Sequence, residues 1–238
     1  MHHAHVRPRL LVLVAGFGAF GSLMAAMSVP SASAAQDASA SSTAKLAIHN
    51  AVKAGWVHES VTALENGNSV TMANDVGTRA GHQVIDSNGA HAQVIVLNGN
   101  AYMYGDANAI ANYFEITKTN PEGYANRWFV LTPANPNFAA VSGSVTLKSD
   151  FENFSIPKNA VLGETTVIDG QKVQAIVGHL SASSSQPAAT ITLYVTTTGK
   201  VLPVRYVVAG KGVHSTTDWS NWGKKVQLTT PKSTPAPN

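Results

Sequence analysis

The sequence contains no cysteine, and this absence excludes disulfide bonds as a means of stabilising the fold. Disulfide bonds form readily outside the cytoplasm, but this chain does not use them. A lipid anchor attached to an N-terminal cysteine is excluded for the same reason. The chain has 238 residues, and a chain of this size buries roughly 70% of the surface that its unfolded form exposes. We therefore expect core packing alone to stabilise the fold.

Motifs of catalysis and nucleotide binding are also absent. There is no G-x-S-x-G elbow, no H-E-x-x-H pair and no G-x-x-x-x-G-K-[ST] loop. The carboxylates are few, and Asp86, Asp106 and Asp169 lie near turn glycines, where aspartate is commonly a turn residue. Asp150 and Glu152 could form a carboxylate pair, but a solvated helix end is the favoured interpretation. We predict a protein that is not an enzyme and that uses no cofactor.

The histidines do not form a recognisable metal site. Six lie beyond the first 34 residues: His49, His58, His82, His91, His179 and His214. A tight turn at Asn88-Gly89 places His91 opposite residue 85 or 86 rather than opposite His82. We expect all six to be surface or half-buried side chains, so no metal site is predicted. A hydrolase with a nucleophile beside one of them stays open as an alternative.

Basic residues are too few and too dispersed to indicate nucleic-acid binding. The net charge is +3, but beyond residue 34 the chain has 14 Lys and Arg against 13 Asp and Glu. The one basic run in that part is Lys224-Lys225. Without a basic stripe there is no electrostatic surface for a phosphate backbone. Nucleic acid is therefore not predicted as a partner.

The N-terminal segment has the order of a secretory signal peptide. Arg7 and Arg9 precede an apolar run that begins at Leu10 and continues, less purely, to Val29. The small residues Ala32-Ser33-Ala34 then provide an A-x-A-like cleavage site. An uncleaved membrane anchor is the alternative, because about 20 apolar residues span a bilayer. Several glycines and serines dilute the run, so we favour cleavage near Ala34 and secretion from the cytoplasm.

Removal of residues 1–34 leaves 204 residues, which is the size of one domain. Residues 35–43 are small and polar, and we expect a flexible leader there. Residues 44–231 form the predicted domain, and the Pro-rich residues 232–238 are expected to be a disordered tail. Apolar residues between Lys45 and Ala54 predict a short opening helix, which Gly55 would end.

Short strands with tight turns follow this helix. Glu59, Val61, Ala63 and Glu65 alternate with Ser60, Thr62 and Leu64. Asn-Gly pairs at 66–67, 88–89 and 98–99 supply the positive φ that two-residue hairpins need. The clearest alternation is at Ile191, Leu193 and Val195. Pro203 predicts that its strand lies at an edge or a bulge, and residues 213–219 and 226–229 are predicted to be the last strands.

The strand pattern breaks between Gly105 and Ala160, where we expect an insert with helices. Residues 106–114 predict a short helix, residues 127–131 a strand, and apolar spacings of three and four predict a helix from Phe138 to Phe151. The predicted fold class is α+β: a curved antiparallel half-barrel sheet with helices over its concave apolar face. Strands that alternate apolar and polar residues have one apolar face, so they need a cover of helices on that face only.

The C-terminal segment runs from Asp218 to Pro231 and contains Trp219-Ser220-Asn221-Trp222-Gly223. It resembles the closing segment of LppX/LprG-like proteins, which are relatives of the LolA/LolB carriers. Weaker similarities agree in their order along the chain: Gly99-Asn100-Ala101-Tyr102, Arg127-Trp128, Asp169-Gly170 and Leu202-Pro203-Val204. The resemblance covers about residues 44–231. It implies a half-open barrel that holds the acyl chains of lipids or lipidated proteins outside the cytoplasm. Many members begin with a lipidated cysteine, which is absent here.

Aromatic and aliphatic residues in and around the insert are the candidates for a ligand-binding pocket wall, although ordinary core packing uses the same residue types. The candidates are Trp56, Tyr102, Tyr104, Tyr113, Phe114, Trp128, Phe138, Val141, Leu147, Phe151, Leu193 and Tyr206. The predicted partner is a lipid or an acylated ligand held by a monomer, with at most transient membrane contact. The alternative is a protein-interaction or envelope-stress sensor module that binds an envelope protein through the sheet edge near Pro203 or through the convex face.

Overall fold

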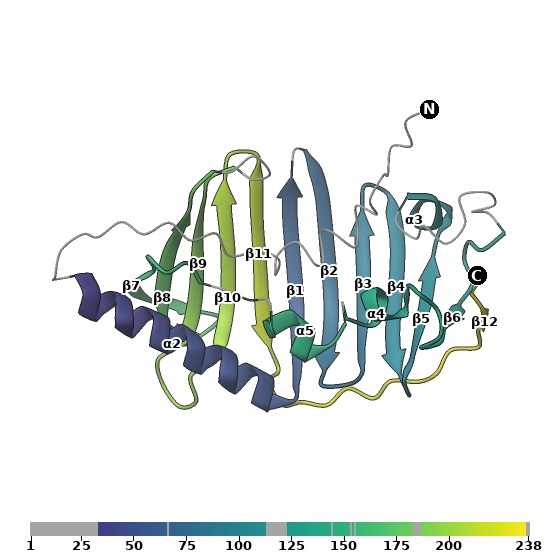
Figure 1. The fold of residues 1–238 in the computed structure, drawn as a ribbon, viewed down its shortest axis with the longest axis horizontal. Helices are drawn as coiled ribbons and strands as arrows, with labels where there is room; N and C mark the ends of the chain where they lie inside the picture. The colour runs from purple at the N-terminus through teal and green to yellow at the C-terminus, as the bar shows by residue number, and fades with distance from the viewer. Residues whose placement is uncertain are drawn as a thin grey trace.

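The computed structural model describes residues 33–65, 67–112, 123–143, 145–152, 154, 156–182 and 187–236. Its strands form two successive meanders (Figure 1). The first contains β1 (Trp56–Glu65), β2 (Asn68–Gly77), β3 (Gly81–Ser87), β4 (Ala90–Leu97), β5 (Asn100–Gly105) and β6 (Phe129–Leu131). The second contains β7 (Val161–Ile168), β8 (Gln171–Leu180), β9 (Ala189–Thr196), β10 (Pro203–Gly210) and β11 (Val213–Ser220), and β12 (Thr234–Pro235) follows it.

All twelve of these strands belong to one open, curved sheet. Their order across the sheet is β12-β6-β5-β4-β3-β2-β1-β11-β10-β9-β8-β7. Only β12 and β6 run parallel; the other neighbours are antiparallel. The two meanders meet where β1 pairs with β11, for example Val61 with Thr217. The first strand and the last long strand of the chain therefore lie side by side in the middle of the sheet.

The predicted hairpin turns are confirmed where the structure describes them. Asn88 and Gly89 have φ values of 50° and 80°, and Asn98 and Gly99 have values of 53° and 74°. Positive φ at both central residues is the geometry that Asn-Gly pairs favour in two-residue turns. These turns set the register of the first meander, in which Asp86 lies opposite His91 as expected.

The helices are α2 (Ser33–Ala54), α3 (Ala107–Asn112), α4 (Phe138–Gly143) and α5 (Leu147–Glu152). In Figure 1, α2, α4 and α5 all lie in front of the same face of the sheet. We name this face the covered face and the opposite one the open face. None of the helices in the described part of the chain is long and apolar enough to cross a membrane.

The core lies on the covered face and has two main parts. The α4 cluster joins Val141 of α4 to Met103, Phe129 and Leu131 of the first meander. The α2 cluster joins helices α2 and α5 to Ile191, Leu193 and Tyr206 of the second meander. Ala40, Ala44, Ala47 and Ala51 form the buried side of α2, and these small side chains let the helix lie close to its neighbours.

Several sequence predictions for the chain ends are wrong. Helix α2 begins at Ser33 and Ala40 is fully buried, so residues 35–43 are not a flexible leader. Alanine has the highest helix propensity, which explains why this small-residue segment joins the predicted helix. Residues 226–229 are not a strand. Instead, Thr234–Pro235, in the predicted disordered tail, pairs with β6. The expected signal peptide lies almost entirely outside the described residues.

Two predictions about the middle of the chain are also corrected. The expected helix from Phe138 to Phe151 is two short helices, because Thr146 between them bridges to Gly77 of β2. The bulge predicted at Pro203 is confirmed by a register shift between Pro203 and Arg205, whereas β10 lies between β9 and β11 and is not an edge strand. The protein-binding edge expected near Pro203 is therefore not available.

Candidate ligand-binding site

The covered face carries a short row of polar side chains across its middle. In β1, Val57, Val61 and Ala63 are buried on this face, and Glu59 occupies the same side because strand side chains alternate. Glu59 lies opposite Asn74 of β2, and Asn74 lies opposite Gln83 of β3. We name Glu59, Asn74 and Gln83 the polar row. It interrupts an otherwise largely apolar surface.

Hydrogen bonds hold the carboxylate of Glu59 in place. The Asn74 side-chain amide donates to Glu59 Oε1 at 3.0 Å, and Trp219 Nε1 donates to Glu59 Oε2 at 3.0 Å. Trp219 is the neighbour of Glu59 across the β1–β11 pair. Gln83 Nε2 lies 3.9 Å from the Met72 sulfur. Each oxygen of Glu59 thus has one fixed donor from a neighbouring strand.

Helix α5 brings a second carboxylate to this region. The Phe151 ring packs on Trp219 with centroids 5.7 Å apart, and the Thr146–Gly77 bridge fixes the other end of the segment. Asp150 lies between these two contacts. Its Oδ2 atom is buried and has no hydrogen-bond partner, so the prediction of a solvated helix end is wrong.

Burial changes the ionisation of both acids. Loss of water around the carboxyl raises the pKa of Glu59, although its hydrogen bonds to Trp219 and Asn74 and the charge of His58 oppose that rise. Burial also raises the pKa of Asp150 well above its ordinary value, and the negative charge of Glu59 raises it further. The two carboxyls are therefore close enough to influence each other.

Aromatic rings surround one side of this pair. Phe151 and Phe154 contact each other and both contact Trp219, with centroid separations of 5.7–6.0 Å. Phe154 also packs against Tyr206 at 4.7 Å, and Phe151 against Trp222 at 6.1 Å. Burial raises the pKa of the Tyr206 hydroxyl. These rings make a rigid apolar wall next to the two carboxyls.

The structure divides the predicted pocket residues between the two faces. Phe138 and Val141 pack in the α4 cluster, and Leu147, Phe151, Leu193 and Tyr206 pack in the α2 cluster. Tyr113 and Phe114 lie outside the described residues. The remaining candidates do not share a face with these clusters. They are Trp56, Tyr102, Tyr104 and Trp128.

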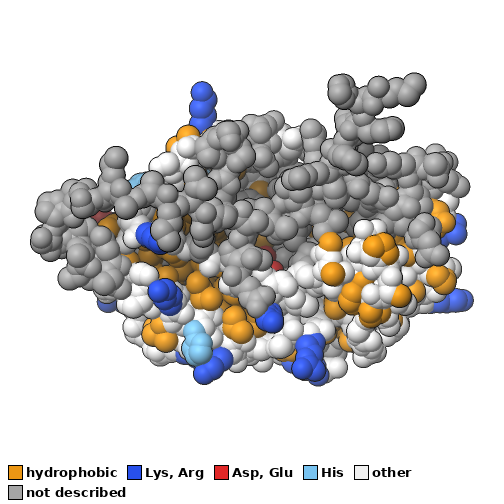
Figure 2. Space-filling view, in the orientation of Figure 1, with side chains coloured by type: hydrophobic (Ala, Val, Ile, Leu, Met, Phe, Trp, Pro, Cys, Tyr) orange, Lys and Arg blue, Asp and Glu red, His pale blue; other side chains and the backbone are white. Residues whose placement is uncertain are grey.

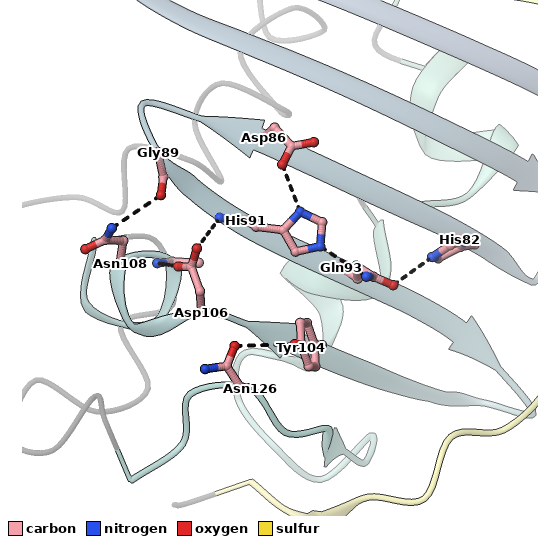
Figure 3. Close-up of polar contacts among 10 residues, drawn as sticks. His82, Asp86, Gly89, His91, Gln93, Tyr104, Asp106, Asn108 and Asn126 are labelled. Carbon is pink, nitrogen blue, oxygen red and sulfur yellow. Dashed lines mark hydrogen bonds and ion pairs between the residues drawn. The ribbon is translucent and has the colours of Figure 1, made fainter.

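Figure 3 shows why Tyr104 and its neighbours lie elsewhere. Tyr104 is on the open face with His91, and α4 and α5 lie behind the strands. The Trp128 ring packs on Tyr104 at 5.5 Å. Tyr102 alternates with the buried Ala101 and Met103, which are in the α4 cluster, so it also points to the open face. Trp56 shares the side of β1 that carries His58. Their proposed contact with a ligand on the covered face is withdrawn.

The open face instead carries a polar network around His91 (Figure 3). His91 Nδ1 lies 2.8 Å from Asp86 Oδ1, and Gln93 links the Nε2 atoms of His91 and His82 at 3.1 and 3.4 Å. Asp106 Oδ2 accepts a hydrogen bond from the His91 amide at 2.8 Å. In the described part of the chain, no three His, Cys, Asp or Glu side chains are grouped to hold a metal ion.

Sequence reasoning missed the polar centre of the covered face. The alternation correctly placed Glu59 on the same side of its strand as Val61 and Ala63. Burial of a carboxylate on that side was not, however, predicted from the sequence. Asn74 gave the same signal in the next strand, because it follows Val70 and Met72 at a spacing of two. A polar residue at an apolar position in two paired strands is the pattern that would have located the site.

The class of protein that this architecture defines is that of LppX/LprG-like folds, and comparison with solved structures confirms the resemblance at the level of fold. LprF from Mycobacterium bovis is 14% identical, with a TM-score of 0.54 over 82% of this chain and 97% of that one. The lipoprotein LppX from Mycobacterium tuberculosis is 17% identical, with a TM-score of 0.53 over 81% of this chain and 100% of that one. No protein-family model matches the chain, and neither does any curated protein.

Proposed function

We propose that this chain is an exported binding protein that holds the acyl chain of a lipid or acylated ligand on the covered face, without catalysing a reaction. The observation that carries the proposal is the kind of cover over the apolar face. Besides the 22-residue α2, the cover consists of α4 and α5, which have only six residues each, and the aromatic ring of Phe154 is only partly buried against the α2 cluster. Short elements of this kind can separate from a sheet more easily than a second sheet can.

The energetics suit a carrier. Burial of apolar surface contributes about 25 cal/mol per Å², so an acyl chain with a few hundred Å² of surface gains several kcal/mol. That is enough for binding and still permits release. The similarity to LppX and LprF supports this role through the shared fold. Because the chain has no cysteine, we propose a secreted monomer, free or held by an envelope protein.

One observation favours the alternative of a protein-interaction module. Strand β7 is an edge of the sheet, and its side chains Val161 and Val167 are 37% and 64% exposed. Exposed apolar residues on an unpaired edge are a common place for another chain to bind. The two functions use different surfaces, so one experiment can separate them.

The test is to express the full chain in a host that exports it, purify it without detergent and analyse an organic extract by lipid mass spectrometry. We expect a stoichiometric lipid and uptake of a fluorescent fatty acid. Phe154→Asp should abolish uptake, because it places a charge among the aromatic rings of the covered face. Val167→Asp is the matched control and should leave uptake unchanged. A lipid-free protein that also fails to take up the probe would refute the proposal.

A further inference from the structure

The polar centre of the covered face contains two buried hydrogen-bond acceptors that lack a donor. Among the described residues, Asn74 Oδ1 and Asp150 Oδ2 are the only buried side-chain oxygens or nitrogens without a partner. Asn74 is 4% exposed, and its amide nitrogen already bonds to Glu59. A buried acceptor without a donor is unfavourable, so each of these two atoms indicates a missing hydrogen-bond donor.

The charge around the two carboxyls indicates the nature of that group. Among the described residues, the charge that favours ionised Glu59 is that of His58, whose side chain points to the open face and pairs there with Asp75 at 2.9 Å. Among the described residues, the charge that acts on Asp150 is that of Glu59, which is negative. Buried carboxylates are usually paired with a cation. Within the described part of the chain no lysine or arginine provides one.

A primary ammonium fits these requirements better than the alternatives do. It carries three N–H donors and a positive charge, which matches two acceptors without donors beside two carboxyl groups. Water would satisfy the acceptors but not the charge. The polar row and Asp150 contain only two carboxylates, and the described residues hold no group of three potential metal ligands.

We propose that Glu59, Asn74 and Asp150 form a binding site for the ammonium headgroup of an amine-bearing amphiphile. This inference rests on the proposed function, because the same ligand's apolar chain lies on the covered face. The polar row stands between the α4 cluster and the α2 cluster, so a chain leaving the headgroup has an apolar surface on either side. In Figure 2, acidic atoms are visible near the centre of this face, between areas of hydrophobic side chains.

The experiment compares three amphiphiles that share a twelve-carbon alkyl chain: the primary amine, the alcohol and the carboxylic acid. Each is titrated by calorimetry into the purified, delipidated full chain at neutral pH, below its critical micelle concentration. We expect the amine to bind about tenfold or more tightly than the alcohol, which corresponds to one hydrogen-bonded charge pair. The carboxylic acid should bind most weakly, because the site repels it.

Variants locate the preference within the fold. Glu59→Gln and Asp150→Asn should each reduce the preference for the amine over the alcohol to about threefold or less. Asp86→Asn is the matched control, because this carboxylate lies on the open face and pairs with His91, and it should keep the full preference. Circular dichroism of each variant checks that it is folded.

The outcomes separate this inference from the proposed function. If none of the three amphiphiles binds, the proposed function fails and the headgroup site fails with it. If all three amphiphiles bind the wild-type protein with equal affinity, or if the acid binds best, the proposed headgroup site is wrong and the carrier function stands. A preference that survives in both Glu59→Gln and Asp150→Asn also overturns it, because the cation is then recognised elsewhere.

Discussion

At the scale of single residues, a buried carboxyl with a raised pKa changes how stability depends on pH. The pKa of Asp150 is raised above its ordinary value of 3.8 by burial and by Glu59. The folded protein therefore binds this proton more readily than the unfolded chain does. As pH rises from that ordinary value through the raised pKa, the folded state becomes less stable. Each unit of difference corresponds to about 1.4 kcal/mol.

The corresponding prediction concerns Asp150→Asn. The variant removes the ionisation but keeps the shape of the side chain, so we expect it to be more stable than wild type at neutral pH and to lose the decline in stability that begins as pH rises above the ordinary carboxyl pKa. Urea unfolding over a series of pH values measures both effects. Asp75→Asn, on the open face, should keep the decline. Parallel profiles for wild type and Asp150→Asn would contradict the burial of this carboxyl.

A second prediction at this scale tests the hydrogen bond between Trp219 and Glu59. Trp219→Phe keeps an aromatic ring but removes the donor to Glu59 Oε2. We expect a loss of about 1–3 kcal/mol in the free energy of unfolding, because a buried carboxylate loses its partner. In a double-mutant cycle with Glu59→Gln, the two effects should not add.

Trp222 provides the control for that cycle. Its indole nitrogen donates to the Pro203 carbonyl rather than to Glu59, at 3.1 Å. Trp222→Phe and Glu59→Gln should therefore be additive within about 0.5 kcal/mol. If both tryptophans couple to Glu59 equally, the coupling comes from general packing and not from the specific hydrogen bond.

At the scale of elements, the position of α5 depends on a close approach to the sheet. A Cβ atom at Gly81 of β3 would lie 2.4 Å from the Val145 carbonyl and 2.9 Å from the Asp75 carbonyl. Gly81 therefore lets the segment before α5 lie directly on β3. This contact, together with the Thr146–Gly77 bridge, fixes the start of the segment that carries Asp150 against β2 and β3.

We predict that Gly81→Ala displaces this segment and costs about 1–3 kcal/mol of stability, which is the usual effect of overpacking. Hydrogen exchange should increase at residues 145–151. The matched control is Gly143→Ala at the end of α4, where the nearest atom to a new Cβ is the Ser149 hydroxyl at 3.7 Å. That variant should be neutral or slightly stabilising, because alanine favours helix. Equal effects of the two changes would argue against the close approach.

Elements with strong local signals could be predicted from the sequence, and those set by long-range contacts could not. Asn88-Gly89 and Asn98-Gly99 define their turns through their own backbone preferences. The spacing within Phe138–Phe151 is helical, but the bridge from Thr146 to Gly77 divides it, and no local pattern encodes that bridge. Thr234 likewise pairs with Phe129 from more than a hundred residues away.

The same distinction applies to the candidate site. Phe151, Leu193 and Tyr206 were predicted because large apolar residues are usually buried, and they lie on the covered face. Tyr104 is also a large aromatic residue, but it alternates with the buried Met103 in β5 and therefore points to the open face. The pairing of Glu59 with Asp150 joins β1 to α5, so it depends on the tertiary structure and could not be read from either segment alone.

At the scale of the whole molecule, the pairing of β1 with β11 joins the two meanders into one sheet. Eight residue pairs connect these strands, from His58–Ser220 to Glu65–Val213. The α2 cluster also crosses the junction, because Val57 of β1 and Val76 of β2 pack with residues of the second meander. Neither meander can therefore unfold without exposing the edge and part of the core of the other.

This arrangement predicts one cooperative unfolding transition for both meanders. In native-state hydrogen exchange with increasing urea, the amides of β1 and β11 should be among the slowest, and those of the edge strands β7 and β12 among the fastest. Peptides from β3–β5 and from β8–β10 should lose protection at the same urea concentration. If one set exchanges fully while the other stays protected, the meanders are separate folding units. Glu59 of β1 and its partner Trp219 of β11 would then lie on opposite sides of an interface that opens independently, and a ligand bound across this interface should bring the two transitions together.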